Sequence, residues 1–133
     1  MPDSTFENLM SVRQRAAEAY VSGDGAKLDS LVPHNGMASF HSPRGETVTG
    51  AENVAARYIK EAPSFHSDGT TQFEIIQQSC DGALGFWTGF QVATVRIGAA
   101  PRRMTMRLRV TEIFRKIGGN WKLIHRHADL PTN

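Results

Sequence analysis

Apolar residues in the first part of the chain recur at intervals of three and four, the spacing of an amphipathic helix. The residues at this spacing are Phe6, Leu9, Arg13, Ala16, Ala17, Tyr20 and Val21, all apolar or aromatic except Arg13. Ser4-x-x-Glu7 has the form of a capping box at its start, and Ser22-Gly23 ends it. The pattern therefore predicts a first helix that buries one face.

Two further helices follow at the same periodicity. A short one carries Leu28, Leu31 and Val32 and stops at Pro33. A longer one opens at a second capping box, Thr49-x-x-Glu52, and closes before Pro63. Between them, residues 37–41 form a short extended run that ends in a turn at 42–45. Three helices are thus expected before the main sheet.

From Gly69 onward the apolar residues alternate with polar ones, which is typical of strands. Strands are predicted over residues 70–79, 83–97, 103–117 and 121–128, with short turn signals between them. Short links between long strands make an antiparallel meander, and strands of this length must curve. Gly85 and Gly89 stand inside the second strand, where a bulge or bend would help. The expected class is an α+β cone whose uncovered end forms a pocket.

Composition narrows the class of protein. The 133 residues suit one domain over 1–133, with 40% hydrophobic and 21% charged residues. The net charge of +2, with late arginines interleaved with apolar residues, gives no reason to expect nucleic-acid binding. A single cysteine excludes an internal disulfide, and without a leader-like start or a long apolar run we expect no membrane contact and a cytoplasmic location.

The last predicted strand carries the most candidate chemistry. Trp121, Leu123, His125, His127 and Asp129 occupy alternate positions, so they are expected to share one face of the strand. Along that face the residues change from apolar to titratable, as they would in the wall of a pocket. Imidazoles can serve as acid, base or ligand near neutral pH, so His125 and His127 are the leading catalytic candidates.

Their partners depend on the register of the last hairpin. If Gly118-Gly119 is a two-residue turn, Glu112 lies opposite His125 and the two form an acid/base pair. A three-residue loop instead brings Thr111 opposite His125 and Arg109 opposite His127. The second arrangement would form an anion-binding corner for a carboxylate or enolate. The sequence leaves both registers open.

The segment Arg109–Asp129 resembles the closing hairpin of SnoaL-like, ketosteroid-isomerase-like proteins of the nuclear transport factor 2-like superfamily. Residues 40–45, 48–50 and 64–69 look like the same pattern, and the Trp-x-x-x-His-x-His element is also similar to the association domain of calcium/calmodulin-dependent kinase II. The resemblance implies the cone fold and a homodimer formed through the outer face of the sheet. It does not imply one activity, because this fold hosts many.

The isomerase chemistry of that family is not expected here. The position of the family's catalytic aspartate is held by Ser42, and that of its oxyanion-hole tyrosine by Ala16. A neutral serine cannot act as the general base. Steroid isomerisation is therefore disfavoured, although the fold is retained.

The remaining candidates complete a provisional site. Arg109 and Asp129 are expected to bind polar groups of a substrate, while Trp87 and Tyr58 would line an apolar pocket or, for Trp87, a subunit interface. A metal would need a third ligand beside His125 and His127, and nothing in the sequence places His41 or His66 nearby, so neither metal nor cofactor is predicted.

Two functions follow from these observations. In the first, the protein binds a small, mostly apolar molecule with a carbonyl or carboxylate and moves a proton with His125 or His127, aided by Glu112 or Arg109. This would make it an isomerase, cyclase or hydrolase. In the second, it is a non-catalytic ligand-binding or oligomerisation module, similar to the kinase association domain.

Overall fold

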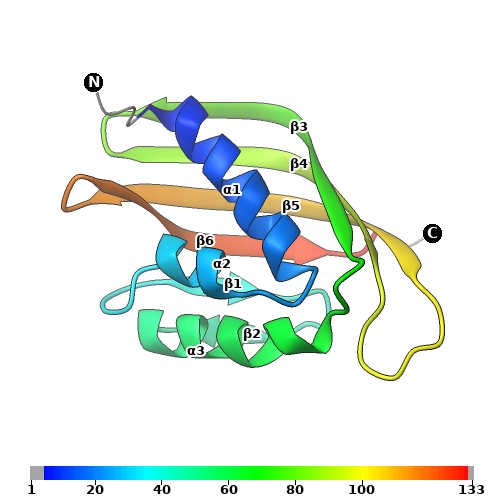
Figure 1. The fold of residues 1–133 in the computed structure, drawn as a ribbon. Helices are drawn as coiled ribbons and strands as arrows, with labels where there is room; N and C mark the ends of the chain where they lie inside the picture. The colour runs from blue at the N-terminus through cyan, green and yellow to red at the C-terminus, as the bar shows by residue number, and fades with distance from the viewer. Residues whose placement is uncertain (1–4, 132–133) are drawn as a thin grey trace.

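The computed structural model describes residues 5–131 and places three helices on one face of a six-stranded sheet (Figure 1). The helical elements are α1 (Phe6–Tyr20), α2 (Ala26–Leu31), α3 (Ala51–Glu61) and the 3-10 turn η1 (Ala62–Ser64). The strands are β1 (Ser39–His41), β2 (Thr47–Thr49), β3 (Thr70–Asp81), β4 (Leu84–Val95), β5 (Met104–Ile117) and β6 (Asn120–Asp129). The predicted α+β class is confirmed.

The strands are ordered β2-β1-β6-β5-β4-β3. The meander β3-β4-β5-β6 is antiparallel as predicted, whereas β1 joins the edge of β6 in parallel. Thr49 was expected to cap a helix, but Thr47–Thr49 forms β2, the second strand of a short hairpin with β1. We call the face covered by the helices the inner face, and the opposite one the outer face.

Neither predicted capping box starts its helix. Ser4 lies outside the described residues, and the N-cap of α1 is Thr5, whose Oγ1 accepts a hydrogen bond from the Asn8 amide. Thr49 ends β2, and the N-cap of α3 is Gly50, which has a φ of 91°. That left-handed conformation suits glycine alone, so backbone geometry rather than a side-chain cap sets the start of α3.

Strand β3 bends at a bulge between Ile75 and Gln77, opposite Gly89 of β4. A Cβ atom at position 89 would lie 2.1 Å from the Glu74 carbonyl oxygen. The glycine therefore lets two backbones approach more closely than any side chain would permit. The expectation that Gly89 accompanies a bulge or bend is confirmed, although the extra residue lies in β3.

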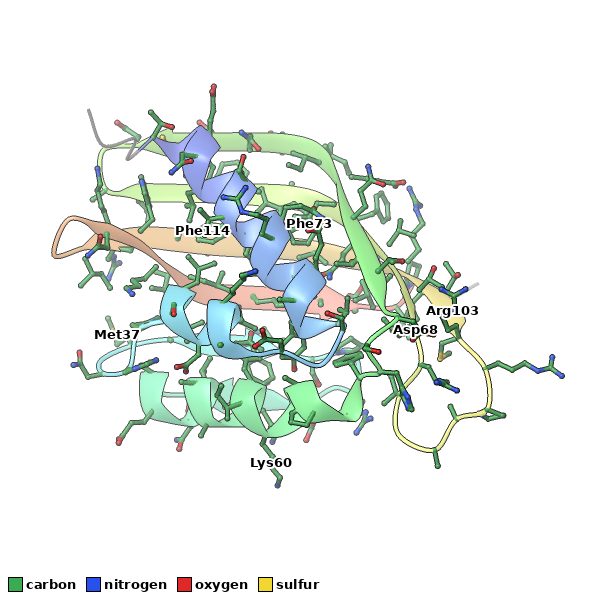
Figure 2. All side chains as sticks on the ribbon, viewed as in Figure 1. Met37, Lys60, Asp68, Phe73, Arg103 and Phe114 are labelled. Carbon is green, nitrogen blue, oxygen red and sulfur yellow. The ribbon has the colours of Figure 1, made fainter. Side chains whose placement is uncertain are left out.

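The core fills the space between α1 and the inner face of the sheet. Phe114 is fully buried, and Phe6 of α1 meets it edge to face with ring centres 5.8 Å apart. Figure 2 shows Phe114 and Phe73 beside α1, whereas Lys60 points from α3 away from the sheet. Within residues 5–131, no helix is long and apolar enough to cross a membrane.

Candidate functional site

The register of the last hairpin differs from both predictions because β6 contains a bulge. Ile117 pairs with Asn120 and Phe114 with Leu123, as a two-residue turn requires. Ile113 then pairs with His125, so Ile124 is an extra residue that the partner strand does not match. Beyond it, Arg126 lies opposite Glu112 and His127 opposite Thr111. The predicted pairing of His125 with Glu112 or Thr111 is therefore wrong.

The bulge also reverses which side chains face the core. Leu123 is buried on the inner face, but after Ile124 the inward positions are Arg126 and Ala128. His125, His127 and Asp129 consequently lie on the outer face, and the prediction that they share a face with Trp121 and Leu123 is wrong. One inserted residue changes the face of every residue after it, since side chains alternate along a strand.

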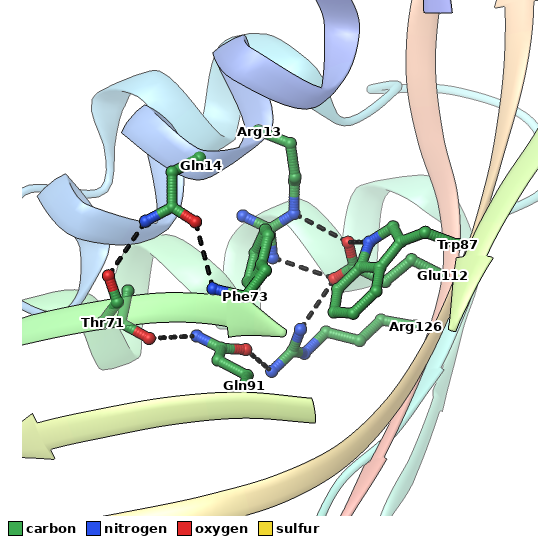
Figure 3. A network of polar contacts seen from close by, with 8 residues as sticks. All are labelled: Arg13, Gln14, Thr71, Phe73, Trp87, Gln91, Glu112 and Arg126. Atoms are coloured by element: carbon green, nitrogen blue, oxygen red, sulfur yellow. Dashed lines mark hydrogen bonds and ion pairs between the residues drawn. The ribbon is translucent and has the colours of Figure 1, made fainter. Parts of the chain in front are cut away.

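Glu112 is the centre of a buried polar network on the inner face (Figure 3). Its Oε1 accepts hydrogen bonds from Arg13 Nε at 2.9 Å and from Trp87 Nε1 at 2.8 Å. Its Oε2 accepts from Arg13 Nη2 at 2.9 Å and from Arg126 Nη1 at 2.7 Å. Glu112 and Trp87 are fully buried. One carboxylate thus joins α1 to three strands of the sheet.

The electrostatics of this cluster keep Glu112 ionised. Burial alone would raise the pKa of the carboxyl, but the charges and hydrogen bonds of Arg13 and Arg126 outweigh it and lower the pKa to about 2. Burial would also lower the pKa of Arg13, yet Glu112 raises it. Two guanidinium groups and one carboxylate leave the cluster with one net positive charge.

The network continues to the edge of the sheet. Arg126 Nη2 donates to Gln91 Oε1 at 2.6 Å, and Gln91 Nε2 donates to Thr71 Oγ1 at 3.0 Å. From α1, Gln14 Nε2 donates to the Thr71 carbonyl, and Gln14 Oε1 accepts from the Phe73 amide. The side chain of Gln14 therefore satisfies the backbone of edge strand β3 as another strand would (Figure 3).

A cavity of about 90 Å³ opens beside this network, between the helices and the inner face. Its walls are Arg13, Tyr20, Val21, Leu28, Tyr58, Phe65, Gln91, Ala93, Val95, Met106, Leu108 and Arg126. Most of these side chains are apolar, and the polar ones converge from α1, α3, β4 and β6. The cavity is thus an apolar space with one cationic wall.

One buried polar atom in the cavity wall has no partner among the described residues. Arg13 Nη1 is buried and makes no hydrogen bond within the described residues. Burial raises the pKa of Tyr58 to about 12 and also raises the pKa of Tyr20. Both phenols are therefore neutral donors at pH 7. A buried N–H without an acceptor is costly, so this position favours an acceptor supplied by a bound molecule.

On the outer face, the structure brings together three histidines that come from two parallel strands. His41 of β1 pairs in register with His127 of β6, and its ring centre is 5.0 Å from that of His127 and 5.2 Å from that of His125. Nearby, Arg109 holds Asp129 through two hydrogen bonds of 2.7 and 3.0 Å. No sequence signal placed His41 beside the other two.

The predicted site residues are therefore divided between two faces. Glu112, Trp87 and Tyr58 lie on the inner side, and only Tyr58 lines the cavity directly. Trp87 is fully buried and thus does not face an interface. His125, His127, Arg109 and Asp129 lie on the outer face. Of these predicted residues, the structure joins Glu112 to Trp87 and Arg109 to Asp129, but not Glu112 to either histidine.

Sequence reasoning missed Arg13 and Arg126 as site residues. Arg13 did give a signal, because a charged residue stands in the apolar stripe of the first helix. Such a residue requires a buried partner. Arg126 gave none, since it stands between two histidines on a strand whose bulge is invisible in the sequence pattern.

Residues 9–133 match the model of the SnoaL-like domain, so the chain belongs to this family. A search of curated proteins found no match. The family match confirms the resemblance to SnoaL-like proteins noted in the sequence.

Solved structures show the same fold at low sequence identity. A candidate dehydratase of the nuclear transport factor 2-like family from Streptomyces avermitilis superimposes with a TM-score of 0.78 at 21% identity, covering 100% of both chains. A superfamily protein from Salmonella enterica gives 0.77 at 17% identity, covering 96% of this chain and 90% of that one. The calcium/calmodulin-dependent kinase II hub of S. rosetta gives 0.74 at 18%, covering 98% and 100%.

Proposed function

We propose that this SnoaL-like protein binds a small monoanion, a carboxylate or an enolate with an apolar body, in the cavity on the inner face. The observation that carries the proposal is the buried Arg13 Nη1, which finds no acceptor in the described residues although it belongs to a cavity wall. An anionic oxygen would accept its hydrogen bond and balance the net charge of the Arg13, Glu112 and Arg126 cluster.

The shape of the cavity supports a small ligand. Its 90 Å³ equals the liquid volume of roughly three water molecules. Leu28, Val95 and Leu108 would surround the apolar body, and the hydroxyls of Tyr20 and Tyr58 could donate to a second oxygen. Short-chain monocarboxylates of two to four carbons match these requirements.

The protonation states favour binding over proton transfer. The titratable groups in the cavity wall are arginines and tyrosines, which keep their protons at neutral pH. Glu112 is held ionised by its two arginines, so it is not available to act as a base. His125 and His127 lie across the sheet from the cavity. We therefore favour the non-catalytic ligand-binding function over the proton-transfer enzyme. The structural match to a candidate dehydratase does not argue for that activity here, because the two sequences are only 21% identical.

The test is a titration with acetate, propionate and butyrate, each compared with its neutral amide, followed by protein NMR and by tryptophan fluorescence. We expect saturable binding of a carboxylate and none of its amide, because the amide lacks the charge. Equal binding of acid and amide, or no saturable binding of any of the three acids, would contradict the proposal.

Variants separate binding from folding. Tyr58→Phe removes one donor and leaves the ring in place, so it should weaken binding by about 1 kcal/mol. Removing Arg13, Glu112 and Arg126 together (Arg13→Met, Glu112→Leu, Arg126→Met) eliminates all the buried charges and should fold while losing carboxylate binding. Arg57→Gln, at a half-buried arginine of α3 that does not line the cavity, is the control and should bind as the wild type does.

A further inference from the structure

The outer face carries a second cluster that the cavity does not use. His41 and His125 come from neighbouring strands, and their rings lie 5.2 Å apart at an angle of 76°. Two imidazole rings that bind the same metal ion have their centres about this far apart, because each coordinating nitrogen lies about 2.0–2.1 Å from the ion.

Both rings are oriented by a hydroxyl on one side. His41 Nδ1 is hydrogen-bonded to Thr47 Oγ1 at 2.8 Å, and His125 Nδ1 to Ser39 Oγ at 2.7 Å. When Nδ1 donates to the hydroxyl, Nε2 carries a lone pair and is free to bind. Metal-binding histidines characteristically have the second nitrogen held in this way, which fixes the tautomer and the ring.

His127, the third ring of this cluster, is held differently from His41 and His125. His127 is more exposed, and its Nε2 lies 3.8 Å from Asp129 Oδ2, an oxygen already bound to Arg109. At 3.8 Å this is not a hydrogen bond, so within the described residues no hydroxyl or carboxylate fixes the tautomer of His127 as Thr47 and Ser39 can fix those of His41 and His125.

Within residues 5–131, no group of three or more His, Cys, Asp or Glu side chains is arranged to hold an ion. A site on this face must therefore use two protein ligands and complete its coordination with water. We propose that His41 and His125 chelate a divalent transition-metal ion of the copper, nickel and zinc group through their Nε2 atoms. This site is independent of the proposed carboxylate cavity, which lies on the opposite face of the sheet.

The test uses Zn²⁺, Ni²⁺ and Cu²⁺ salts in calorimetric titrations at pH 7.5, with electron paramagnetic resonance of the Cu²⁺ sample. We expect one ion per chain, with Cu²⁺ binding tightest in accord with its general preference for nitrogen ligands. The Cu²⁺ spectrum should show two coordinated imidazole nitrogens. A spectrum without protein nitrogen, or the absence of a one-to-one heat, would overturn the proposal.

Single substitutions identify the ligands. His41→Gln and His125→Gln should each weaken binding tenfold or more and leave one imidazole in the Cu²⁺ spectrum. His127→Gln and the distant His34→Gln should retain both nitrogens and the affinity. Ser39→Ala should weaken binding without changing the number of nitrogens, because it only orients His125. Equal losses in His34→Gln or His127→Gln, or none in His41→Gln, would show that the ion binds elsewhere.

Discussion

Arg126 Nη1 donates to Glu112 Oε2 at 2.7 Å across β5 and β6, at the position where one of the two predicted registers placed His125. The pair exists because Ile124 is an extra residue in β6 and turns Arg126 toward the inner face. The same insertion turns His125 and His127 outward. A single bulge thus separates a buried charged network from a surface histidine cluster.

Replacing Glu112 by Gln should destabilise the protein by about 3 kcal/mol or more, because two buried guanidinium groups lose their counter-charge. Urea denaturation at pH 7 measures the change. Glu74→Gln breaks an exposed pair with Arg107 and serves as the control, with an expected effect within about 1 kcal/mol. Similar losses in both variants would mean that the network contributes no more than a surface ion pair.

The free energy of unfolding should fall as the pH drops from about 4.5 to about 2. Glu112 has a lowered pKa in the folded state, so its stabilising effect is complete above its unfolded value of 4.5 and is lost as the pH falls through about 2. Its maximal slope is about 1.4 kcal/mol per pH unit for one proton. Urea midpoints between pH 6 and pH 2.5 provide the measurement. The variant without Arg13, Glu112 and Arg126 should show a shallower decline, and an identical one would contradict this assignment.

Gly89→Ala should destabilise the protein by roughly 1–3 kcal/mol, since the new Cβ would meet the Glu74 carbonyl and the Ile76 amide. Both obstacles are backbone atoms that cannot rotate away. Gly85→Ala provides the comparison, because its Cβ would meet mainly the ring of Phe6. Thermal unfolding should rank Gly89→Ala as the more damaging change, and the reverse order would show that β3 adapts easily.

Gln14→Leu should free the edge of β3. The Phe73 amide and the Thr71 carbonyl lose their side-chain partner, which costs about 0.5–1.5 kcal/mol. Hydrogen exchange of the Phe73 amide should accelerate, while amides in the centre of β5 remain protected. Gln78→Leu, at an exposed position of the same strand, is the matched control. Unchanged exchange in Gln14→Leu would mean that the edge is protected by other means.

The homodimer expected from the family resemblance should form through partly exposed apolar residues of the outer face, which are Phe86, Phe90, Val92 and Ile113. Phe90→Glu would place a charge within that interface and should shift the protein toward a monomer in sedimentation velocity runs. Met37→Glu adds the same charge at a residue that is 78% exposed elsewhere, and should not alter the assembly. A monomeric wild-type protein would exclude this dimer.

Local patterns in the sequence were sufficient for the helices and the four long strands. The spacing of apolar residues from Phe6 to Val21 predicted α1, and the alternation after Gly69 together with short Gly turns predicted the four long strands. These features depend on residues close together in the chain. The elements formed by longer-range pairing were less visible, and β2 was mistaken for the start of a helix because Thr49 and Glu52 imitate a capping box.

The sequence alone therefore determined the fold class, the family and the position of the turn at Gly118-Gly119, because periodicity, turn chemistry and motif resemblance are local properties. Only the tertiary structure decided which side chains meet. Arg13 and Glu112 are joined across 99 positions, and His41 reaches His125 through a parallel pairing that no local signal encodes. The bulge at Ile124 matters most, because it alone directs Arg126 to the interior and the two histidines to the surface. Whether such a bulge is stable depends on packing between neighbouring strands, which a local sequence pattern does not contain.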